Sequence, residues 1–480
     1  MYYRVSDNFK LVSYKGFPCG FYRKPSYETF FINDKDTYLL LYRCDGCQSI
    51  DEAQLTERQK RGLDEFERLG IIEKLENPLE KPEIIEASFH SCVPRREVHW
   101  SITGECNYKC RHCFQSAPEG VLGSPSLEQL LDIIQQLKAC GIHRVSLTGG
   151  EPLIRKDLFD IIDACLANEI MITTIYSNGA LVTQQLLDGL KERGVKCGFQ
   201  ISFDGVGFHD WMRGIKGAEN MAFRAMELLR RNDFSFSCAM CLCKENAGSL
   251  KETVLKLAEA GVIGMKVQKT MPQGEWMHET EHFLTNEETM AVYEDFIDWY
   301  AKTQPPIGVQ LEGVCSLNPP KKGQSGCSAE ILMESHIAKE ALGVTPSCDM
   351  LLSSFFIGPN GGVTPCMSMC GAAIEAQFPN MFETPLKSIL TDSSLIKLCR
   401  TTRAEILAAN PQCCDCEYAV KCCGGSCRAL AVGEKGTDYL CADEFACWFY
   451  KSGWYDRIKK AIDTRFEKSE HSAEGEGVHC

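Results

Sequence analysis

The chain has 480 residues, 44% of them apolar, which is enough to build the cores of about two to three domains. Its formal net charge of −14 argues against binding to a phosphate backbone, so we expect no nucleic-acid partner. The first residues lack a signal-peptide pattern and no uncharged apolar run reaches the length of a membrane span, which predicts a cytoplasmic protein without a membrane partner.

Residues 1–85 are expected to form a separate unit. Strand-like runs at residues 9–14, 20–24 and 28–33 precede helix-compatible stretches that extend to residue 75, and a small wing completes the unit. This order resembles the PqqD-like winged helix called the RiPP recognition element, which binds the leader of a ribosomally made precursor peptide. The resemblance implies strand addition at an exposed sheet edge. A DNA reader or a structural cap is the alternative use of a winged helix.

A linker is expected at residues 86–97, and an α/β domain at residues 98–309. In this domain, capping-box signatures at Ser126 and Thr285 mark helix starts between and after the apolar runs. Six of these runs are predicted strands, at residues 98–103, 144–150, 170–179, 196–205, 234–243 and 264–272. The alternation predicts a parallel sheet in the form of a partial (β/α)6 barrel, whose loops at the C-terminal strand ends carry the chemistry.

Three cysteines, Cys106, Cys110 and Cys113, lie in one short loop directly after the first predicted strand. Three thiolates can hold three corners of a 4Fe-4S cluster, and no nearby fourth cysteine completes the set, so one iron stays open. An open iron is a site for a substrate or cosubstrate. A zinc site is the alternative, because zinc also favours thiolates in short loops.

The second predicted strand ends in Gly149, Gly150, Glu151 and Pro152. The glycines let a backbone approach a bound ligand closely, and the glutamate offers an acceptor for an ammonium group. Together with the cysteine loop, this order resembles the radical S-adenosylmethionine (SAM) enzymes. The resemblance implies that the open iron chelates the amino and carboxylate groups of SAM, whose cleavage yields a 5'-deoxyadenosyl radical. This radical abstracts hydrogen from an unactivated carbon.

Polar residues also follow the third and fourth predicted strands: Ser177 and Asn178, then Ser202 and Asp204, with Arg213 after them. By resemblance to SPASM-type radical enzymes, these positions contact the ribose and carboxylate of SAM. A turn and a strand end are the alternative interpretations. The other cysteines of this region are interpreted as packing, namely Cys140, Cys165, Cys197, Cys238, Cys241 and Cys243, and Cys44 and Cys47 as turn residues.

Residues 310–463 contain loops, glycines and many cysteines, which resemble the SPASM domain and its two auxiliary 4Fe-4S clusters. The resemblance implies a nearer auxiliary cluster on Cys348, Cys366 and Cys427, with Cys327 or Cys315 as a candidate fourth ligand. It implies an outer auxiliary cluster on Cys413, Cys416, Cys422 and Cys441, so that the chain would hold three 4Fe-4S clusters in all. Twenty-eight cysteines without an export signal agree with several such clusters in a reducing cell.

The cysteine spacing departs from the SPASM pattern near its end. The interval to Cys427 is C-x4-C from Cys422 and C-x3-C from Cys423, so the two cannot be separated on paper. The further candidates are Cys414, Cys370 and Cys447, and a zinc ribbon is the alternative for the C-x2-C pair. Residues 464–480 are polar and are expected to be disordered.

The layout resembles that of maturases acting on ribosomal peptides. We expect an enzyme that installs intramolecular thioethers, from a cysteine sulfur to a carbon, in a precursor peptide, with an electron donor such as flavodoxin or ferredoxin as a second partner. An auxiliary cluster would accept an electron or bind a substrate thiolate. Carbon–carbon cyclisation and epimerisation use nearly the same parts. Sulfatase maturases lack the N-terminal unit and carry Asp where Met367 follows Cys366. A non-catalytic zinc or DNA-binding module is the rival from another class.

Overall fold

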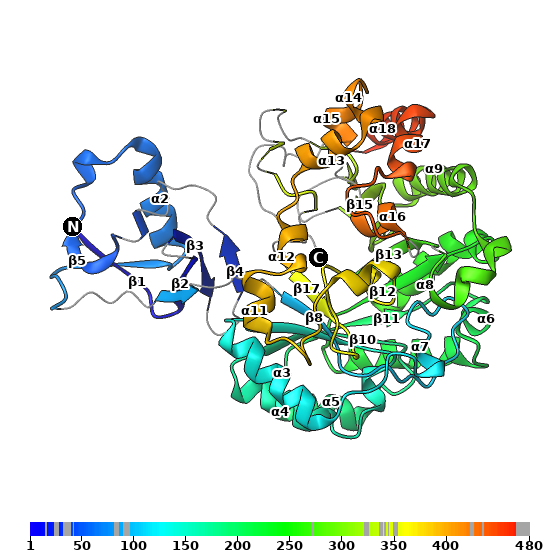
Figure 1. The fold of residues 1–480 in the computed structure, drawn as a ribbon, viewed down its shortest axis with the longest axis horizontal. Coiled ribbons are helices and arrows are strands. Elements are labelled where there is room, and N and C mark those ends of the chain that lie inside the picture. Colours follow the sequence, from blue (N-terminus) through cyan, green and yellow to red (C-terminus); the bar gives the residue numbers. More distant parts are fainter. Residues whose placement is uncertain are drawn as a thin grey trace.

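The computed structural model describes residues 1–14, 17–23, 28–31, 40–41, 43–80, 86–89, 97–270, 272–320, 326–335, 339, 342–343, 345–348, 354–422, 427–433 and 436–466. An N-terminal unit lies at one end of the molecule, and a larger body is built around one long sheet (Figure 1). The two parts have separate cores. No helix in the described residues is both long and apolar enough to cross a membrane.

The N-terminal unit contains two small sheets and a helix. One sheet has the order β5-β1-β6 and the other the order β4-β3-β2-β7. Their strands are β1 (Tyr2–Val5), β2 (Phe9–Tyr14), β3 (Phe17–Arg23), β4 (Glu28–Phe31), β5 (Asp45–Ser49), β6 (Ile72–Leu75) and β7 (Glu86–Phe89). The three predicted strands are present, as β2, β3 and β4. Helix α2 (Glu57–Arg68) begins at a capping box on Thr56.

Two expectations for this region differ from the structure. Residues 72–75 form β6 rather than the end of a helix, because Gly70, with φ +68°, ends the helix and turns the chain back to pair with β1. The expected linker begins with β7, which pairs in parallel with β2. Residues 90–96, the rest of this linker before β8, lie outside the described residues.

The larger body is built on a mostly parallel sheet, which confirms the predicted α/β fold. All six predicted strands are present as consecutive parallel neighbours. They are β8 (Glu97–Ser101), β9 (Arg144–Thr148), β10 (Met171–Ser177), β11 (Gly198–Ser202), β12 (Phe236–Leu242) and β13 (Gly264–Lys269). Because parallel strands present their C-terminal ends at one edge, the loops that follow them meet on one side of the sheet.

Helices cover the outer face of the curved sheet (Figure 1). They are α3 (Leu127–Ala139), α4 (Leu158–Ala167), α5 (Gln184–Glu192), α7 (Ala218–Arg231), α8 (Leu250–Ala260) and α9 (Asn286–Thr303), whereas the short α6 (His209–Arg213) follows β11 near the cysteines at its C-terminal end. Both predicted capping boxes are confirmed: Ser126 and Gln129 begin α3, and Thr285 and Glu288 begin α9. The apolar sides of these helices and strands form one continuous core.

The sheet continues beyond residue 309. Strand β14 (Gly308–Leu311) adds in parallel to β13, and β15 (Cys315–Asn318) and β16 (Ser328–Ile331) follow antiparallel. At the other end β17 (Ser354–Ile357) adds in parallel to β8 and pairs with β18 (Val363–Thr364). The cysteine-rich region is therefore tied to both ends of the sheet.

The remaining C-terminal elements are short helices, of which α11 lies beside α3 near the β8 end of the sheet, whereas α13 to α18 lie farther along the molecule (Figure 1). They are α11 (Leu386–Thr391), α12 (Ser394–Cys399), α13 (Arg403–Ala409), α14 (Pro411–Cys414), α15 (Ala419–Cys422), α16 (Arg428–Val432), α17 (Glu444–Lys451) and α18 (Trp454–Arg465). Helix α18 packs along α9, where Arg465 pairs with Asp298 at 2.9 Å. The expected disordered tail therefore begins too early, because residues 464 and 465 are helical, and residues 467–480 lie outside the described part.

Candidate active site

The cysteine loop, which we define as residues 102–116, follows β8 as predicted. Cys106, Cys110 and Cys113 are all half-buried. Each sulfur accepts a hydrogen bond: Cys106 from the Tyr108 backbone N–H at 3.4 Å, Cys110 from the Arg213 guanidinium at 3.7 Å, and Cys113 from the Ala117 backbone N–H at 3.3 Å. Hydrogen bonds to ligand sulfur stabilise the thiolate and tune the potential of a cluster. The donor set fits the three-cysteine cluster that the sequence predicts.

Glycines from three other segments press against the backbone of this loop. A Cβ atom on Gly150 would lie 2.2 Å from the Glu105 carbonyl oxygen, one on Gly214 2.3 Å from that of Lys109, and one on Gly274 2.2 Å from that of Cys113. Gly149 likewise packs on Thr103, at 2.5 Å. We expected Gly149 and Gly150 to let the backbone approach a ligand; what they approach is the cysteine loop itself.

Glu151 is fully buried and joins the ends of two strands. Its Oε1 accepts hydrogen bonds from the Ser177 hydroxyl at 3.0 Å and the Leu153 N–H at 3.2 Å, and its Oε2 accepts one from the Asn178 N–H at 2.7 Å. Burial raises the pKa of Glu151 to about 7, although these hydrogen bonds oppose the shift. Asn178 in turn donates to the Asn107 side chain at 2.8 Å, which links this group to the cysteine loop.

Asp204 and Arg213 form a buried ion pair beneath the cysteine loop, with Arg213 Nε 2.6 Å from Asp204 Oδ2. Burial alone would raise the pKa of Asp204, but Arg213 and the nearby His112 and His209 outweigh it and hold this pKa well below its usual range. Burial also lowers the pKa of His112 to about 4. Because Arg213 donates to Cys110 as well, the pair couples the loop to the end of β11.

The inner face of the sheet is polar and half-buried, whereas the face under the helices is apolar. His99, Gln200 and Lys266 point inward from β8, β11 and β13, between buried apolar neighbours in the strand. Ser202 is half-buried at the end of β11. Lys266 pairs with Glu312 at 2.8 Å. We call these inward-facing polar side chains the polar lumen.

The three cysteines assigned to the nearer auxiliary cluster come together. The pKa of Cys366 is raised by burial and further by the thiols of Cys427 and Cys348, which lie within electrostatic range. The two candidate fourth ligands are buried elsewhere: Cys315 begins β15, where burial alone raises its pKa to about 12, and Cys327 precedes β16 close to Tyr300. For Cys315 no electrostatic effect of the trio accompanies this burial.

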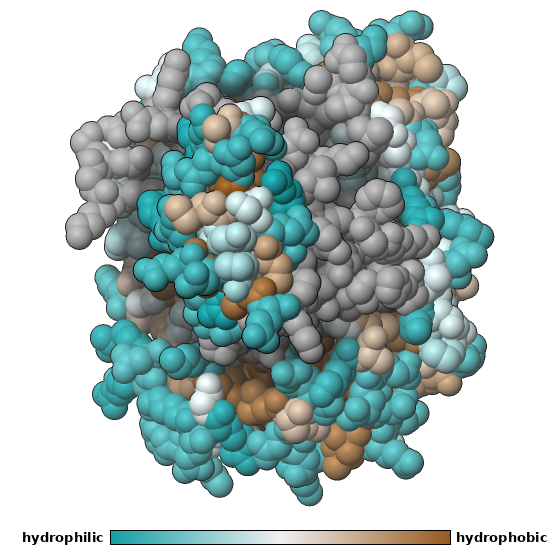
Figure 2. Space-filling model, turned by 90° about the vertical axis from the view of Figure 1, so that its left-hand side faces the viewer, coloured by the Kyte–Doolittle hydropathy of each residue, from teal (hydrophilic) through white to brown (hydrophobic). Residues whose placement is uncertain are grey.

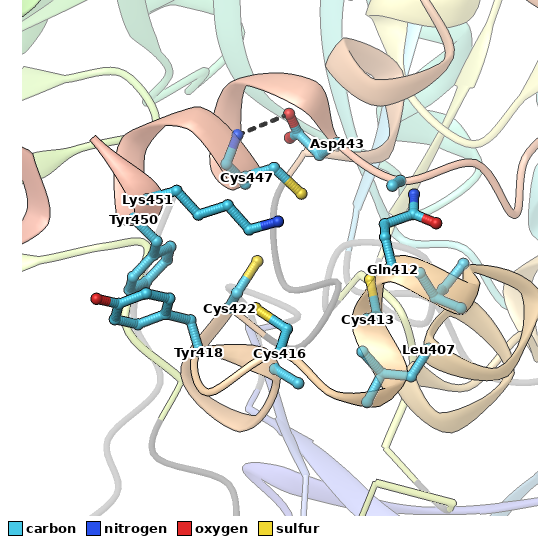
Figure 3. Close-up of a pocket in the computed structure, with 14 residues that line it drawn as sticks. Leu407, Gln412, Cys413, Cys416, Tyr418, Cys422, Asp443, Cys447, Tyr450 and Lys451 are labelled. Carbon is cyan, nitrogen blue, oxygen red and sulfur yellow. Dashed lines mark hydrogen bonds between the residues drawn. The ribbon is translucent and has the colours of Figure 1, made fainter. Parts of the chain in front are cut away.

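The outer cysteines line one pocket (Figure 3). The sulfur atoms of Cys413, Cys416 and Cys422 face a fourth sulfur, from Cys447 on α17, and the Lys451 side chain extends between them (Figure 3). Cys441, the residue predicted in this place, does not line the pocket. Sequence reasoning named Cys447 only as a further candidate. Cys423 lies outside the described residues.

No three His, Cys, Asp or Glu side chains in the described residues converge closely enough to hold a single metal ion. A 4Fe-4S cluster binds each thiolate through a different iron, so its ligands surround a larger space than those of one ion.

The sheet, the cysteine loop after its first strand and the cysteine groups beyond it agree with the layout of a radical SAM domain followed by an auxiliary-cluster domain. Residues 100–257 match the Radical SAM superfamily, and residues 348–417 match SPASM, an iron-sulfur cluster-binding domain. Residues 100–257 thus carry a radical SAM domain and residues 348–417 a SPASM domain, and these two domains imply S-adenosylmethionine and 4Fe-4S clusters as cofactors.

Relatives of two kinds resemble the chain. The AdoMet-dependent heme synthase of Methanosarcina barkeri is 27% identical over 359 residues, covering 72% of this chain and 94% of that protein. Mycofactocin maturase MftC of Mycolicibacterium smegmatis is 29% identical over 178 residues, or 36% of this chain and 44% of that protein. The structure of Streptococcus suis SuiB bound to precursor peptide SuiA has a TM-score of 0.61 at 16% identity, covering 92% of this chain and 99% of SuiB. At that identity the likeness shows a shared fold.

Gly150→Ala should displace the cysteine loop, because the added methyl group would overlap the Glu105 carbonyl. We expect a loss of stability of about 1–3 kcal/mol, typical of overpacking, and less iron bound after anaerobic reconstitution. Gly248→Ala is the matched control, since a methyl group there would meet no other described part of the chain within 4 Å. Equal iron content in the two variants would contradict the proposal that the close contact of Gly150 with Glu105 holds the cysteine loop in place.

Asp204→Asn keeps the shape of the side chain but leaves Arg213 buried without its counter-charge. Breaking a buried pair in this way costs about 3–5 kcal/mol. Urea unfolding should show this loss in the free energy of unfolding. Asp163→Asn, which breaks the exposed pair with Arg193, should cost no more than about 1 kcal/mol. If both variants lowered the free energy of unfolding by a similar amount, burial of the ion pair would not be the reason for its contribution to stability.

Cys447→Ala should remove one ligand of the outer cluster. If that cluster is lost, iron falls by about a third, from about twelve to about eight atoms per chain. Iron and sulfide analysis after anaerobic reconstitution measures the change. Cys165→Ala, which removes a buried thiol of α4, should leave the iron content unchanged. Full iron occupancy in Cys447→Ala, together with an EPR spectrum of the reduced protein that added 2-mercaptoethanol leaves unchanged, would exclude Cys447 as a ligand.

Proposed function

We propose that the chain is a radical SAM maturase that installs intramolecular thioethers, from a cysteine sulfur to a carbon, in a ribosomally made precursor peptide. The observation that carries this proposal is the N-terminal unit at residues 1–85, which has a core of its own and precedes the radical SAM domain. A small-molecule enzyme has no need of such a unit, whereas a peptide substrate offers a leader segment for it to bind.

The sheets of this unit have edges suited to strand addition. Among the described strands, β4 and β5 each pair on one side only. Gln48 and Ser49 at the end of β5 are exposed. An extended leader peptide can add to such an edge through main-chain hydrogen bonds. The described surface on this side of the molecule is largely hydrophilic, with apolar side chains in small groups, which suits recognition through the backbone (Figure 2).

A peptide substrate is supported by how much of this chain each similar protein covers. The heme synthase match leaves more than a quarter of this chain uncovered, whereas SuiB, whose structure holds a precursor peptide, covers nearly all of it. MftC, a maturase, is similar to less than half of the chain. We therefore propose a peptide substrate because the likeness to SuiB extends over the N-terminal unit as well as over the radical SAM domain.

The cofactors, when bound, supply a carbon-centred radical on the substrate. The chain's residues hold and orient the parts: Ser202 and Arg213 keep some exposed surface at the strand ends and are proposed to contact SAM. Glu151 and Asp204 are fully buried, so they act by positioning their neighbours. Gly149, Gly150, Pro152, Ser177 and Asn178 complete the proposed SAM site. Three clusters are proposed, and a flavodoxin or ferredoxin as electron donor.

A second candidate is the modification of an iron porphyrin. The observation that favours it is the match to the AdoMet-dependent heme synthase, which spans 94% of that protein. The barrel and SPASM region alone do not separate the two candidates, because one scaffold serves many substrates.

The test is to incubate the anaerobically reconstituted full chain with SAM, a reductant and the cysteine-containing peptide encoded beside its gene. We expect a product lighter by two hydrogens for each bond, with the cysteine protected from iodoacetamide. The same peptide without its leader should bind more weakly, measured by fluorescence anisotropy. Cys106→Ala/Cys110→Ala/Cys113→Ala is the inactive control.

Other outcomes identify other reactions. Loss of two hydrogens with the cysteine still alkylated points to a carbon–carbon bond, and unchanged mass with deuterium uptake from solvent points to epimerisation. Turnover of an iron porphyrin, with no change in any peptide and no leader binding, would overturn the proposal in favour of the second candidate.

A further inference from the structure

Arg428 is a buried cation without an anionic partner in the described part of the chain. Its side chain is 2% exposed, and its Nε and Nη1 atoms have no hydrogen-bond partner. Nη2 donates to the Cys441 carbonyl at 2.7 Å. Burying an unpaired charge is costly, and buried charges in proteins are paired or bind a charged group. Arg428 therefore indicates an anion in its surroundings.

The surroundings of Arg428 belong to the nearer auxiliary cysteines. Arg428 directly follows Cys427, and its guanidinium lies 5.7 Å from the ring of Tyr439. The Tyr439 hydroxyl lies 3.1 Å from the Ser347 hydroxyl, and Ser347 precedes Cys348. The same Arg428 side chain contacts Cys441 at both its carbonyl and its thiol, and Arg428 directly follows Cys427 of the trio formed by Cys348, Cys366 and Cys427.

The outer pocket, in contrast, is complete without Cys441. Four sulfur atoms line it, and the fourth comes from Cys447 (Figure 3). Ala442 and Asp443 also line this pocket, whereas Cys441 directly before them does not. Between Cys441 and Ala442 the chain therefore passes from the surroundings of Arg428 to the pocket of the outer cysteines.

We propose that Cys441 is the fourth thiolate ligand of the nearer auxiliary cluster, with Arg428 as the counter-charge of that cluster. A cluster held by four thiolates carries net negative charge, which a buried guanidinium stabilises. The ligand sets are then Cys348, Cys366, Cys427 and Cys441 for the nearer cluster, and Cys413, Cys416, Cys422 and Cys447 for the outer one. Both auxiliary clusters are fully ligated by the protein.

This assignment limits how a substrate is handled. A nearer cluster with four protein thiolates has no iron open to a sulfur of the substrate, so the reacting cysteine is held by the polar lumen instead. This consequence rests on the proposed thioether function, but the ligand assignment does not.

The experiment needs no peptide and uses the full chain with Cys106→Ala/Cys110→Ala/Cys113→Ala, so that only auxiliary clusters form. We expect about eight irons per chain and an EPR spectrum of the reduced protein that 2-mercaptoethanol does not change. Adding Cys441→Ala should open one iron, so that 2-mercaptoethanol now changes the spectrum. A spectrum that responds to 2-mercaptoethanol before Cys441 is removed would overturn the assignment.

Two further variants keep the test decisive. Cys399→Ala removes another buried thiol near Tyr439 and should behave like its parent. Arg428→Met should keep the iron but lower the reduction potential of one cluster, because the cluster loses a nearby positive charge. An unchanged potential would exclude Arg428 as the counter-charge, even if Cys441→Ala failed to fold.

Discussion

The backbone of one cysteine loop is held by contacts that only glycine permits. Gly150, Gly214 and Gly274 come from three separate segments, and each lies against a carbonyl of the loop at a distance that no side chain allows. Hydrogen bonds from Gly150 to Thr103 and from Glu151 to Glu105 add to these contacts. The three thiols therefore take their positions from the sheet, since the loop that carries them is too short and irregular to fix them alone.

A second constraint on the site is that each buried charged side chain must have a group that offsets its charge. Arg213 is satisfied by Asp204 and also reaches Cys110, so one ion pair ties a cysteine to the end of β11. Arg428 is also buried, but it has no carboxylate beside it in the described part of the chain. The contrast is informative, because a folded chain tolerates a buried charge only when something offsets it. At Arg213 that group is part of the protein, and at Arg428 it is the proposed cluster.

Features that depend on local sequence could be predicted. The six parallel strands and the capping boxes at Ser126 and Thr285 follow from hydrophobic periodicity and neighbouring residues, and all are present. Long-range packing could not be predicted. Nothing near Cys447 in the sequence separates it from Cys441, because the choice depends on how α17 lies against α14 and α15. Likewise, the burial of Glu151 depends on β10, which follows it in the chain.

The polar lumen explains how one scaffold serves different substrates. Its inward-facing residues, among them His99, Lys266 and Glu312, alternate with apolar residues that build the core, so they contribute less to the apolar packing than their neighbours do. The barrel supplies the radical chemistry, whereas selection of a substrate falls to the parts outside it. In the proposed function those parts are the N-terminal unit, where β4 and β5 each pair on one side only among the described strands, and the cysteine-rich region joined to both ends of the sheet. A long flexible substrate can contact both at once, which a compact one cannot.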